Sequence, residues 1–210
     1  MDNKNYYKSI GLTKRRNMKI GLLGGSFNPA HDGHIYISNE ALKRLELDEI
    51  WWLVSPQNPL KSNSTSAPMK IRLENARRIA KGHNIRVEDL ETKFKTNFTS
   101  KTLELIIKRY SGSSFIWLMG ADNLVEINRW FKWKSIFQIM PVAVFNRDVY
   151  SYSVINSIAG KHYYSKLHKT KDSKSIFKKP LPVWQFLHIN KNPLSSTLLR
   201  LKNNQKQETH

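Results

Sequence analysis

The chain has 210 residues, of which 40% are hydrophobic and 11% aromatic, and a formal net charge of +19 at pH 7. This composition predicts a globular chain with a substantial core and excludes the disordered class. No apolar run approaches the roughly 20 residues of a membrane-spanning helix, and the basic N-terminal stretch lacks the apolar segment of a secretory signal. Cysteine is absent, which excludes disulfides and thiolate zinc sites; the cytoplasm is the default expectation.

The strong positive charge has two interpretations. A basic surface is typical of proteins that bind nucleic acid or a membrane surface. It also suits a lysine-rich protein that acts on a small polyanionic substrate. The lysines are scattered along the chain, as at Lys43, Lys81, Lys108 and Lys161, and this favours the small substrate. We therefore expect no specific nucleic-acid partner and no membrane association, with a basic nucleic-acid-binding module as the alternative.

Taken in chain order, the sequence predicts one domain with short flanking segments. Residues 1–17 are polar and basic and predict an N-terminal extension, residues 18–203 a single domain, and residues 204–210 a polar tail. Residues 56–68 form a long polar loop, and loops of this length are usually functional or mobile. The basic stretch 161–180 is weakly patterned and is assigned to no element.

Apolar runs predict six strands, and several of these runs are continuous, as in parallel strands that are covered on both faces. The expected strands are residues 18–24, 49–55, 84–89, 114–119, 141–146 and 183–189. Apolar residues at helical spacing lie between them. The three helical stripes are Ser38, Ala41, Leu42 and Leu45; Met69, Leu73, Ala76 and Ala80, closed by Gly82 at the C′ position; and Leu103, Ile106, Ile107 and Tyr110.

Strands that alternate with helices predict an α/β fold with right-handed crossovers. We expect a Rossmann-like doubly wound sheet, mostly parallel, with helices on both faces. Ligands of such sheets bind beyond the carboxyl ends of the strands, where the strand order reverses.

The most informative stretch follows the first strand. Gly24 and Gly25 end an apolar run, a turn follows, and His31 and His34 flank Gly33 at the start of a helical pattern. Glycines supply turns and let a backbone approach phosphate closely. A helix start offers unpaired N–H groups and partial positive charge to an anion. Imidazole N–H groups aimed at the same anion would stabilise charge that grows in a transition state.

Simpler interpretations of this stretch stay open. A glycine-rich turn is often only a turn, and one histidine at such a place is more often structural. Two histidines also suit a metal site, but no third ligand lies at ligand spacing nearby. The stretch lacks both the Gly-Lys-Ser/Thr of a P-loop and the G-x-G-x-x-G of a dinucleotide fold.

The motifs together resemble a known family. Gly24–Pro29 with His31-x-Gly33-His34 resembles the phosphate-binding signature of the nucleotidyltransferase superfamily, and Ser195–Arg200 resembles its second signature. Motifs between them narrow the resemblance to bacterial nicotinate-mononucleotide adenylyltransferases over about residues 18–200. These motifs are Val54–Lys61, Asn97–Leu103, Gly120–Asn123 and Arg129–Phe131.

This resemblance implies a reaction. The family transfers AMP from ATP to nicotinate mononucleotide, giving nicotinic acid adenine dinucleotide and pyrophosphate. The nucleophile is a phosphate oxygen of the substrate, which suits a chain without a catalytic Ser/His/Asp or Cys/His set. The protein positions two anions for in-line attack and neutralises charge at the α-phosphate. Mg²⁺ would be the cofactor, held by the nucleotide phosphates and not by a protein metal site. An adenylyltransferase for another phosphate acceptor, such as phosphopantetheine, is the alternative.

The resemblance also assigns residues. His31, His34 and Arg200 would be catalytic. The ATP site would contain Gly24, Gly25, Ser26, Phe27, His31, His34, Gly120, Asp122, Ser195, Ser196, Thr197 and Arg200. The mononucleotide site would contain Asn58, Lys61, Thr99, Trp130 and Arg147.

Several of these assignments keep plain alternatives. Ser195 and Ser196 are also good helix N-caps, Lys61 could be a solvated side chain, and Trp130 could be a core residue instead of one that stacks on the pyridine ring. The chain departs from the family at Asn28, where aspartate is common, and at Ser26, where threonine is frequent. A homo-oligomer is left open.

Overall fold

The computed structural model describes residues 17–56, 66–146 and 151–189. Within these ranges six strands form one fully parallel sheet in the order β3-β2-β1-β4-β5-β6. All six strand predictions are confirmed to within one or two residues. The strands are β1 (Lys19–Gly25), β2 (Glu49–Val54), β3 (Ile85–Glu88), β4 (Ser114–Gly120), β5 (Val142–Asn146) and β6 (Trp184–His188).

Helices connect the strands, and all three predicted helical stripes lie on helices, apart from Tyr110, which caps the last of them. The α-helices are α2 (Asp32–Leu45), α3 (Met69–Ala80), α4 (Leu90–Lys93), α5 (Thr99–Arg109), α6 (Ala121–Glu126), α7 (Trp133–Ile139), α8 (Ser151–Asn156) and α9 (Ile158–His162). Gly82 follows α3 with a φ of 85°, as expected of a left-handed C′ residue. The unassigned stretch 161–180 contains the end of α9 and two short 3₁₀ helices, η3 (Tyr164–Lys166) and η4 (Ser173–Lys178).

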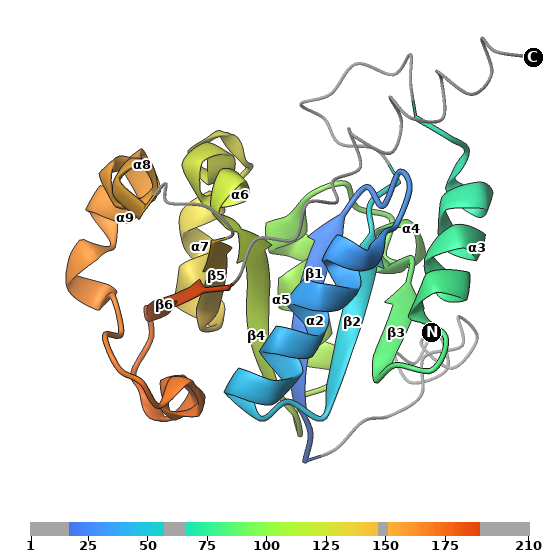
Figure 1. The fold of residues 1–210 in the computed structure, drawn as a ribbon. Coiled ribbons are helices and arrows are strands. Elements are labelled where there is room, and N and C mark those ends of the chain that lie inside the picture. Colours follow the sequence, from blue (N-terminus) through green and yellow to red (C-terminus); the bar gives the residue numbers. More distant parts are fainter. Residues whose placement is uncertain (1–16, 57–65, 147–150, 190–210) are drawn as a thin grey trace, which may run out of the picture.

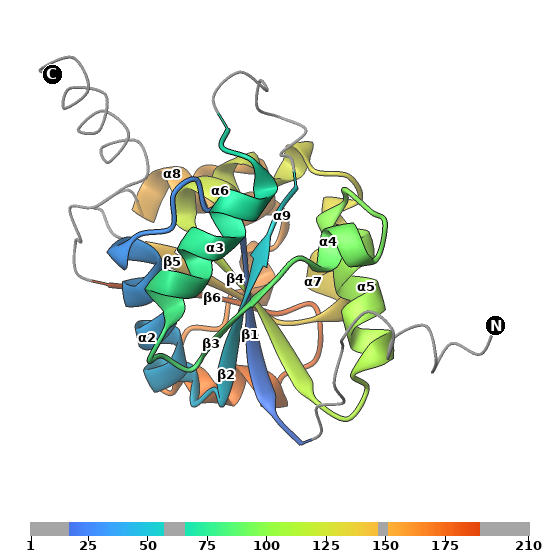
Figure 2. The ribbon, with the colours of Figure 1, turned by 90° about the vertical axis from the view of Figure 1, so that its right-hand side faces the viewer.

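Helices cover both faces of the sheet, which confirms the doubly wound α/β prediction (Figures 1 and 2). On one face, Ile20 of β1 and Trp51 of β2 join a core that continues into α5 to α9. On the other face, Leu23 and Trp52 join a core with α2, α3 and η4. Alternate residues of one strand therefore enter different cores, which is why these strands read as continuous apolar runs. No helix among the described residues is long and apolar enough to span a bilayer.

The strand order reverses beside β1. The chain passes from β1 to β2 and β3 on one side and then crosses to β4, which pairs with the opposite side of β1. The carboxyl ends of β1 and β4 therefore diverge into helices on different faces of the sheet. This is the place where open parallel sheets bind ligands.

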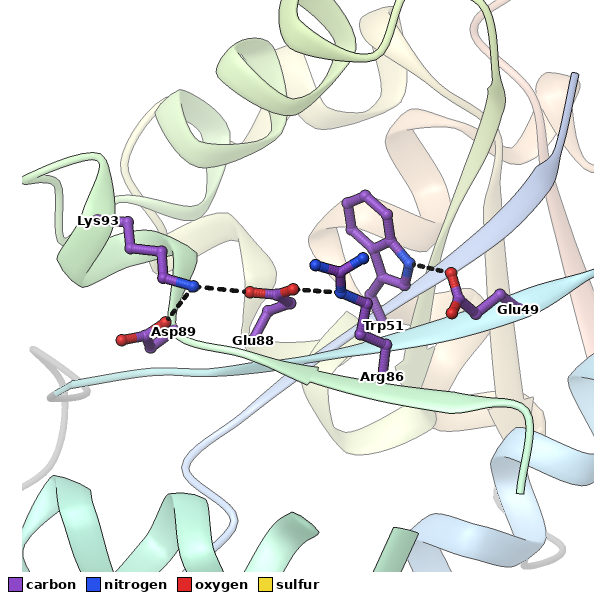
Figure 3. A network of polar contacts seen from close by, with 6 residues as sticks. All are labelled: Glu49, Trp51, Arg86, Glu88, Asp89 and Lys93. Atoms are coloured by element: carbon purple, nitrogen blue, oxygen red, sulfur yellow. Dashed lines mark hydrogen bonds and ion pairs between the residues drawn. The ribbon is translucent and has the colours of Figure 1, made fainter. Parts of the chain in front are cut away.

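Charged side chains occupy the β3 edge of the sheet (Figure 3). The Glu88 carboxylate lies between Arg86 and Lys93 and accepts hydrogen bonds from both. The Arg86 guanidinium lies 5.6 Å from the ring centre of Trp51, whose indole N–H donates to Glu49 at 2.7 Å. Charges along an edge strand discourage pairing with another chain, so this network protects an edge that has no neighbouring strand in the described sheet.

One buried hydrogen bond joins α2 to β2. The Trp52 indole N–H donates to the Ser38 hydroxyl at 2.9 Å, and both residues are fully buried. Ser38→Ala would leave the indole N–H without a partner and should lower the free energy of unfolding by about 1–3 kcal/mol. Asn39→Ala, at the exposed neighbouring position, is the matched control and should change the free energy of unfolding by less than about 0.5 kcal/mol. Urea denaturation measures both; equal effects would contradict the assignment.

Candidate active site

The turn after β1 is shaped by aromatic rings. A Cβ atom on Gly24 would collide with the Trp117 ring, and one on Gly25 would lie 3.3 Å from the Phe27 ring. Neither glycine has a positive φ; the left-handed residue of the turn is Phe27, with a φ of 46°. The sequence interpretation, in which the glycines make the turn, is therefore wrong for this stretch. The glycines make room for the rings that support it.

Phe27 is held in its left-handed conformation by burial. Its side chain is 1% exposed and lies against the rings of Trp52 and His34, at 4.9 Å and 4.8 Å between ring centres. A left-handed backbone costs a residue with a Cβ on the order of 1 kcal/mol or more. Such strain is concentrated at functional turns, and here the packed ring offsets it.

His31 and His34 cap α2 reciprocally. Nδ1 of His31, the N-cap residue, accepts a hydrogen bond from the Gly33 N–H at 3.1 Å. Nδ1 of His34 accepts one from the His31 N–H at 3.2 Å. This is a capping box in which imidazoles replace the usual hydroxyl and carboxylate. The two ring centres are 3.9 Å apart, so the expected proximity of the histidines is confirmed.

These caps determine where each neutral ring carries its proton. A nitrogen that accepts a backbone N–H cannot itself hold a proton, so the proton of each neutral imidazole is on Nε2. His31 is 5% exposed, whereas His34 is partly exposed. Both rings therefore lie at the positive dipole end of α2, with the proton of each neutral ring on Nε2. A helix start of this kind suits an anion.

The end of β4 forms the other side of the reversal point. Gly120 is the N-cap of α6, and Asp122 lies in the first turn of that helix. A Cβ atom on Gly120 would collide with the Asp122 carboxylate, which is folded back over the glycine. The structure thus places both predicted residues at the carboxyl edge of the sheet, next to the strand that carries the histidine turn.

The start of α5 is the third part of the candidate site, after the histidine turn and the α6 start. Ser100 Oγ donates to the Phe131 carbonyl at 3.1 Å, and the rings of Phe98 and Phe131, both exposed, lie 4.4 Å apart. This contact brings Thr99, the first residue of α5, close in structure to the loop that carries Trp130. Trp130 is partly buried and packs against the core, as its core alternative expects, and its stacking role stays a prediction. The exposed Phe98–Phe131 pair was missed from the sequence.

The α5 start has backbone donors available. Its N-cap, Phe98, makes no side-chain cap. The N–H of Thr102 is bonded to the Phe98 carbonyl, and earlier N–H groups of a helix have no partner within the helix. A carboxylate is a suitable ligand for such a start.

Sequence reasoning also missed two buried polar residues at this edge. Glu91 is 8% exposed and accepts a hydrogen bond from Ser55 Oγ at 3.0 Å, just beyond β2. Burial raises the pKa of the Glu91 carboxyl, and the Ser55 hydrogen bond opposes that shift. Arg72 of α3 is 4% exposed. Each is one of many charged residues in the sequence, and only its burial distinguishes it.

The remaining predicted site residues lie outside the described residues, so their roles stay predictions. They are Asn58, Lys61, Arg147, Ser195, Ser196, Thr197 and Arg200. Among the described residues, no group of three or more His, Asp or Glu side chains is arranged to hold a metal ion.

The fold and the site define a class of protein. A sequence model of the Cytidylyltransferase-like family matches residues 22–202, which include the end of β1, the histidine turn and most of the chain. The protein is therefore a nucleotidyltransferase of that class.

Relatives specify the family within the class. A protein of Cereibacter sphaeroides named probable nicotinate-nucleotide adenylyltransferase is 43% identical over 87% of this chain and 96% of its own length. Proteins with the same name from Methylorubrum extorquens and Rhizobium johnstonii are 40% and 39% identical over 88% of this chain, covering 100% and 93% of their own lengths. The chain belongs to the nicotinate-nucleotide adenylyltransferase family.

Solved structures agree on the fold. Plasmodium falciparum nicotinic acid mononucleotide adenylyltransferase in complex with NaAD is similar with a TM-score of 0.63 at 19% identity, over 88% of this chain and 83% of that one. The same enzyme in complex with APC gives a TM-score of 0.61. At this identity the similarity supports the arrangement of sheet and helices.

The reciprocal cap makes a testable claim about stability. His31→Ala removes the acceptor of the Gly33 N–H and should lower the free energy of unfolding by about 0.5–2 kcal/mol. His31→Asn should recover most of this loss, because asparagine is a preferred N-cap whose Oδ1 accepts the same hydrogen bond. Urea denaturation of the three proteins measures the difference. Equal destabilisation by alanine and asparagine would show that capping is not what His31 contributes.

Proposed function

We propose that this protein transfers AMP from ATP to nicotinate mononucleotide, giving nicotinic acid adenine dinucleotide and pyrophosphate. The observation that carries this proposal is the reciprocal cap of His31 and His34 at the start of α2. Because each Nδ1 accepts a backbone N–H, the proton of each neutral ring is on Nε2. Family membership supplies the substrate pair, since the relatives bear the name of this activity.

The ATP phosphates would lie at the histidine turn. Backbone groups of Gly24 to Phe27, the positive end of α2 and the two imidazoles would surround them. The rings need not gain or lose a proton to act. Each donates a hydrogen bond from a position set before substrate arrives, so the site is preorganised for the charge that grows on the α-phosphate oxygens.

The reaction needs no protein nucleophile. A phosphate oxygen of nicotinate mononucleotide attacks the α-phosphorus of ATP, the bond to the bridging oxygen breaks, and pyrophosphate leaves with that oxygen. Both reactants are anions, so the protein contributes orientation and charge neutralisation. Arg200, with Ser195, Ser196 and Thr197, would hold the departing phosphates.

The pyridine half of the substrate would bind at the α5 start. Thr99 would meet the nicotinate carboxylate through its backbone N–H, and Trp130 would stack on the ring. Asn58, Lys61 and Arg147 would complete this half. The structure describes two of these residues, Thr99 and Trp130, and both belong to elements that pack on the opposite face of the sheet from α2. The two substrates would therefore approach each other across the carboxyl edge of β1 and β4.

Nucleotidyltransferases of this family generally use a divalent metal, and we propose Mg²⁺, entering with ATP as part of the substrate. Phosphate oxygens and water suit Mg²⁺ better than a protein cage does. The single domain 18–203, the cytoplasmic location, the absence of a specific nucleic-acid partner and the open question of a homo-oligomer stay predictions.

A substrate panel tests the proposal. Purified protein with Mg-ATP should release pyrophosphate with nicotinate mononucleotide, and much less with nicotinamide mononucleotide or phosphopantetheine. His34→Ala tests the histidine turn itself and should lower kcat by about 10²–10³, as loss of one transition-state donor does. Product from phosphopantetheine alone would favour the alternative acceptor, and no product from any acceptor would refute adenylyl transfer.

A proline substitution tests the backbone contact at the α5 start. Thr99→Pro deletes the N–H that would meet the carboxylate, while proline is favoured at the first helical position and Phe98 already has the extended backbone that precedes proline. KM for nicotinate mononucleotide should rise about 10- to 100-fold, the loss expected for one charge-assisted hydrogen bond. Thr99→Ala keeps the N–H and should stay near wild type. Equal KM values for the two variants would contradict the contact.

A further inference from the structure

The inner face of α3 holds the histidine turn through one buried cation. Arg72 is 4% exposed, and among the described residues its side chain donates four hydrogen bonds, all to backbone carbonyl oxygens. Nη1 donates to Ser26 at 2.6 Å and to Ser55 at 2.7 Å, Nη2 to Pro56 at 2.8 Å, and Nε to Ala67 at 2.9 Å. One guanidinium therefore joins the segment after β1, the segment after β2 and the segment before α3.

The fork shape of arginine is needed for this arrangement. Its planar guanidinium presents donors in fixed directions, whereas a lysine ammonium is a compact charge on a flexible stem. One of the residues whose carbonyl binds Arg72 also has other contacts. Ser55 is also held by its own N–H, which donates to the Gly25 carbonyl at 2.9 Å, and by its hydroxyl, which donates to Glu91.

A second residue of α3 holds the other end of the same turn. Asn75 lies one helical turn after Arg72, and its Oδ1 accepts a hydrogen bond from the Ala30 N–H at 3.1 Å. Ala30 directly precedes His31, the N-cap of α2. Arg72 fixes the turn at Ser26 and Asn75 fixes it at Ala30. Two side chains on one face of α3 thus bind both ends of the stretch 26–30.

The charge of Arg72 is not neutralised by an ion pair. Within the described ranges no carboxylate lies at ion-pair distance from its guanidinium, and the nearby Glu91 carboxyl binds the Ser55 hydroxyl instead. Burial lowers the pKa of Arg72, but an arginine stays protonated in proteins. A full positive charge therefore lies against the Ser26 carbonyl, in the segment that leads from β1 to His31.

We propose that Arg72 is a positioning residue for ATP, which holds the 26–30 turn in the shape that receives the phosphates and adds buried positive charge behind it. This inference rests on the proposed function. Arg72 touches neither substrate; it acts through the Ser26 carbonyl and the turn that follows. Because the Ser26 carbonyl points at the guanidinium, the N–H of the same trans peptide, which belongs to Phe27, points away from Arg72 and is free to face an anion. Within the described ranges, backbone carbonyls thus take the place of a carboxylate partner for this buried arginine.

Arg72→Lys is the central variant, because it keeps the charge and removes the fork. With Mg-ATP and nicotinate mononucleotide varied separately, KM for ATP should rise about 10- to 100-fold, since misplacement of about 1 Å costs up to that much. KM for nicotinate mononucleotide should change less than about threefold. Arg77→Lys, at an exposed position of the same helix, is the matched control and should leave both values unchanged. A merely structural role would affect both substrates alike or neither.

Asn75→Ala keeps the inference testable if Arg72→Lys does not fold. It should raise KM for ATP in the same direction by a smaller factor, with Glu74→Ala, at an exposed neighbouring position, as its control. Unchanged KM for ATP in a folded Arg72→Lys protein, or equal rises for both substrates, would overturn the inference.

A separate measurement distinguishes failure of the inference from failure of the proposed function. If the wild-type protein makes no dinucleotide, adenylyl transfer fails. Titration calorimetry with a non-hydrolysable ATP analogue then still tests Arg72: about 10- to 100-fold weaker binding to Arg72→Lys than to wild type supports positioning. Equal binding, or no binding to wild type, overturns it.

Discussion

A parallel sheet that is buried on both faces confines chemistry to its edges, because side chains along its strands are enclosed by helices. In this protein Ile20 and Leu22 of β1 point into one core and Leu23 into the other. Only where β1 ends, at Gly25, can the chain present polar groups to a ligand. The histidine turn, the α6 start with Asp122 and the α5 start with Thr99 all lie at that edge, on elements that leave the sheet in different directions.

At that edge the same atoms serve folding and chemistry. The Nδ1 atoms of His31 and His34 complete the N-terminus of α2, and this use leaves Nε2 as the donor of each neutral ring. A site made in this way does not need a second layer of residues to choose the tautomer. Phe27 adds the third constraint, since its buried ring touches His34 and fixes the turn between strand and helix.

The sequence predicts the fold well because both of its signals are local. Continuous apolar runs locate the six strands, and helical spacing locates α2, α3 and α5. The histidine motif is likewise contiguous and is found by reading. What reading misses depends on burial and on contacts between distant segments: Arg72 is one of several basic residues on α3, and its carbonyl partners are known only once the ends of β1 and β2 lie beside it. The packing constraint on Gly24 is hidden for the same reason, since the Trp117 ring that needs the space is 93 residues away in the sequence.

That contact between Gly24 and Trp117 has an evolutionary consequence. The indole of β4 occupies the volume that a side chain at position 24 would fill, so the two positions are coupled through space, not through the reaction. A homologue that carries alanine or a larger residue at position 24 must carry a smaller residue at position 117. Invariance of the first glycine would then report the size of a core side chain in the neighbouring strand as well as any contact with phosphate.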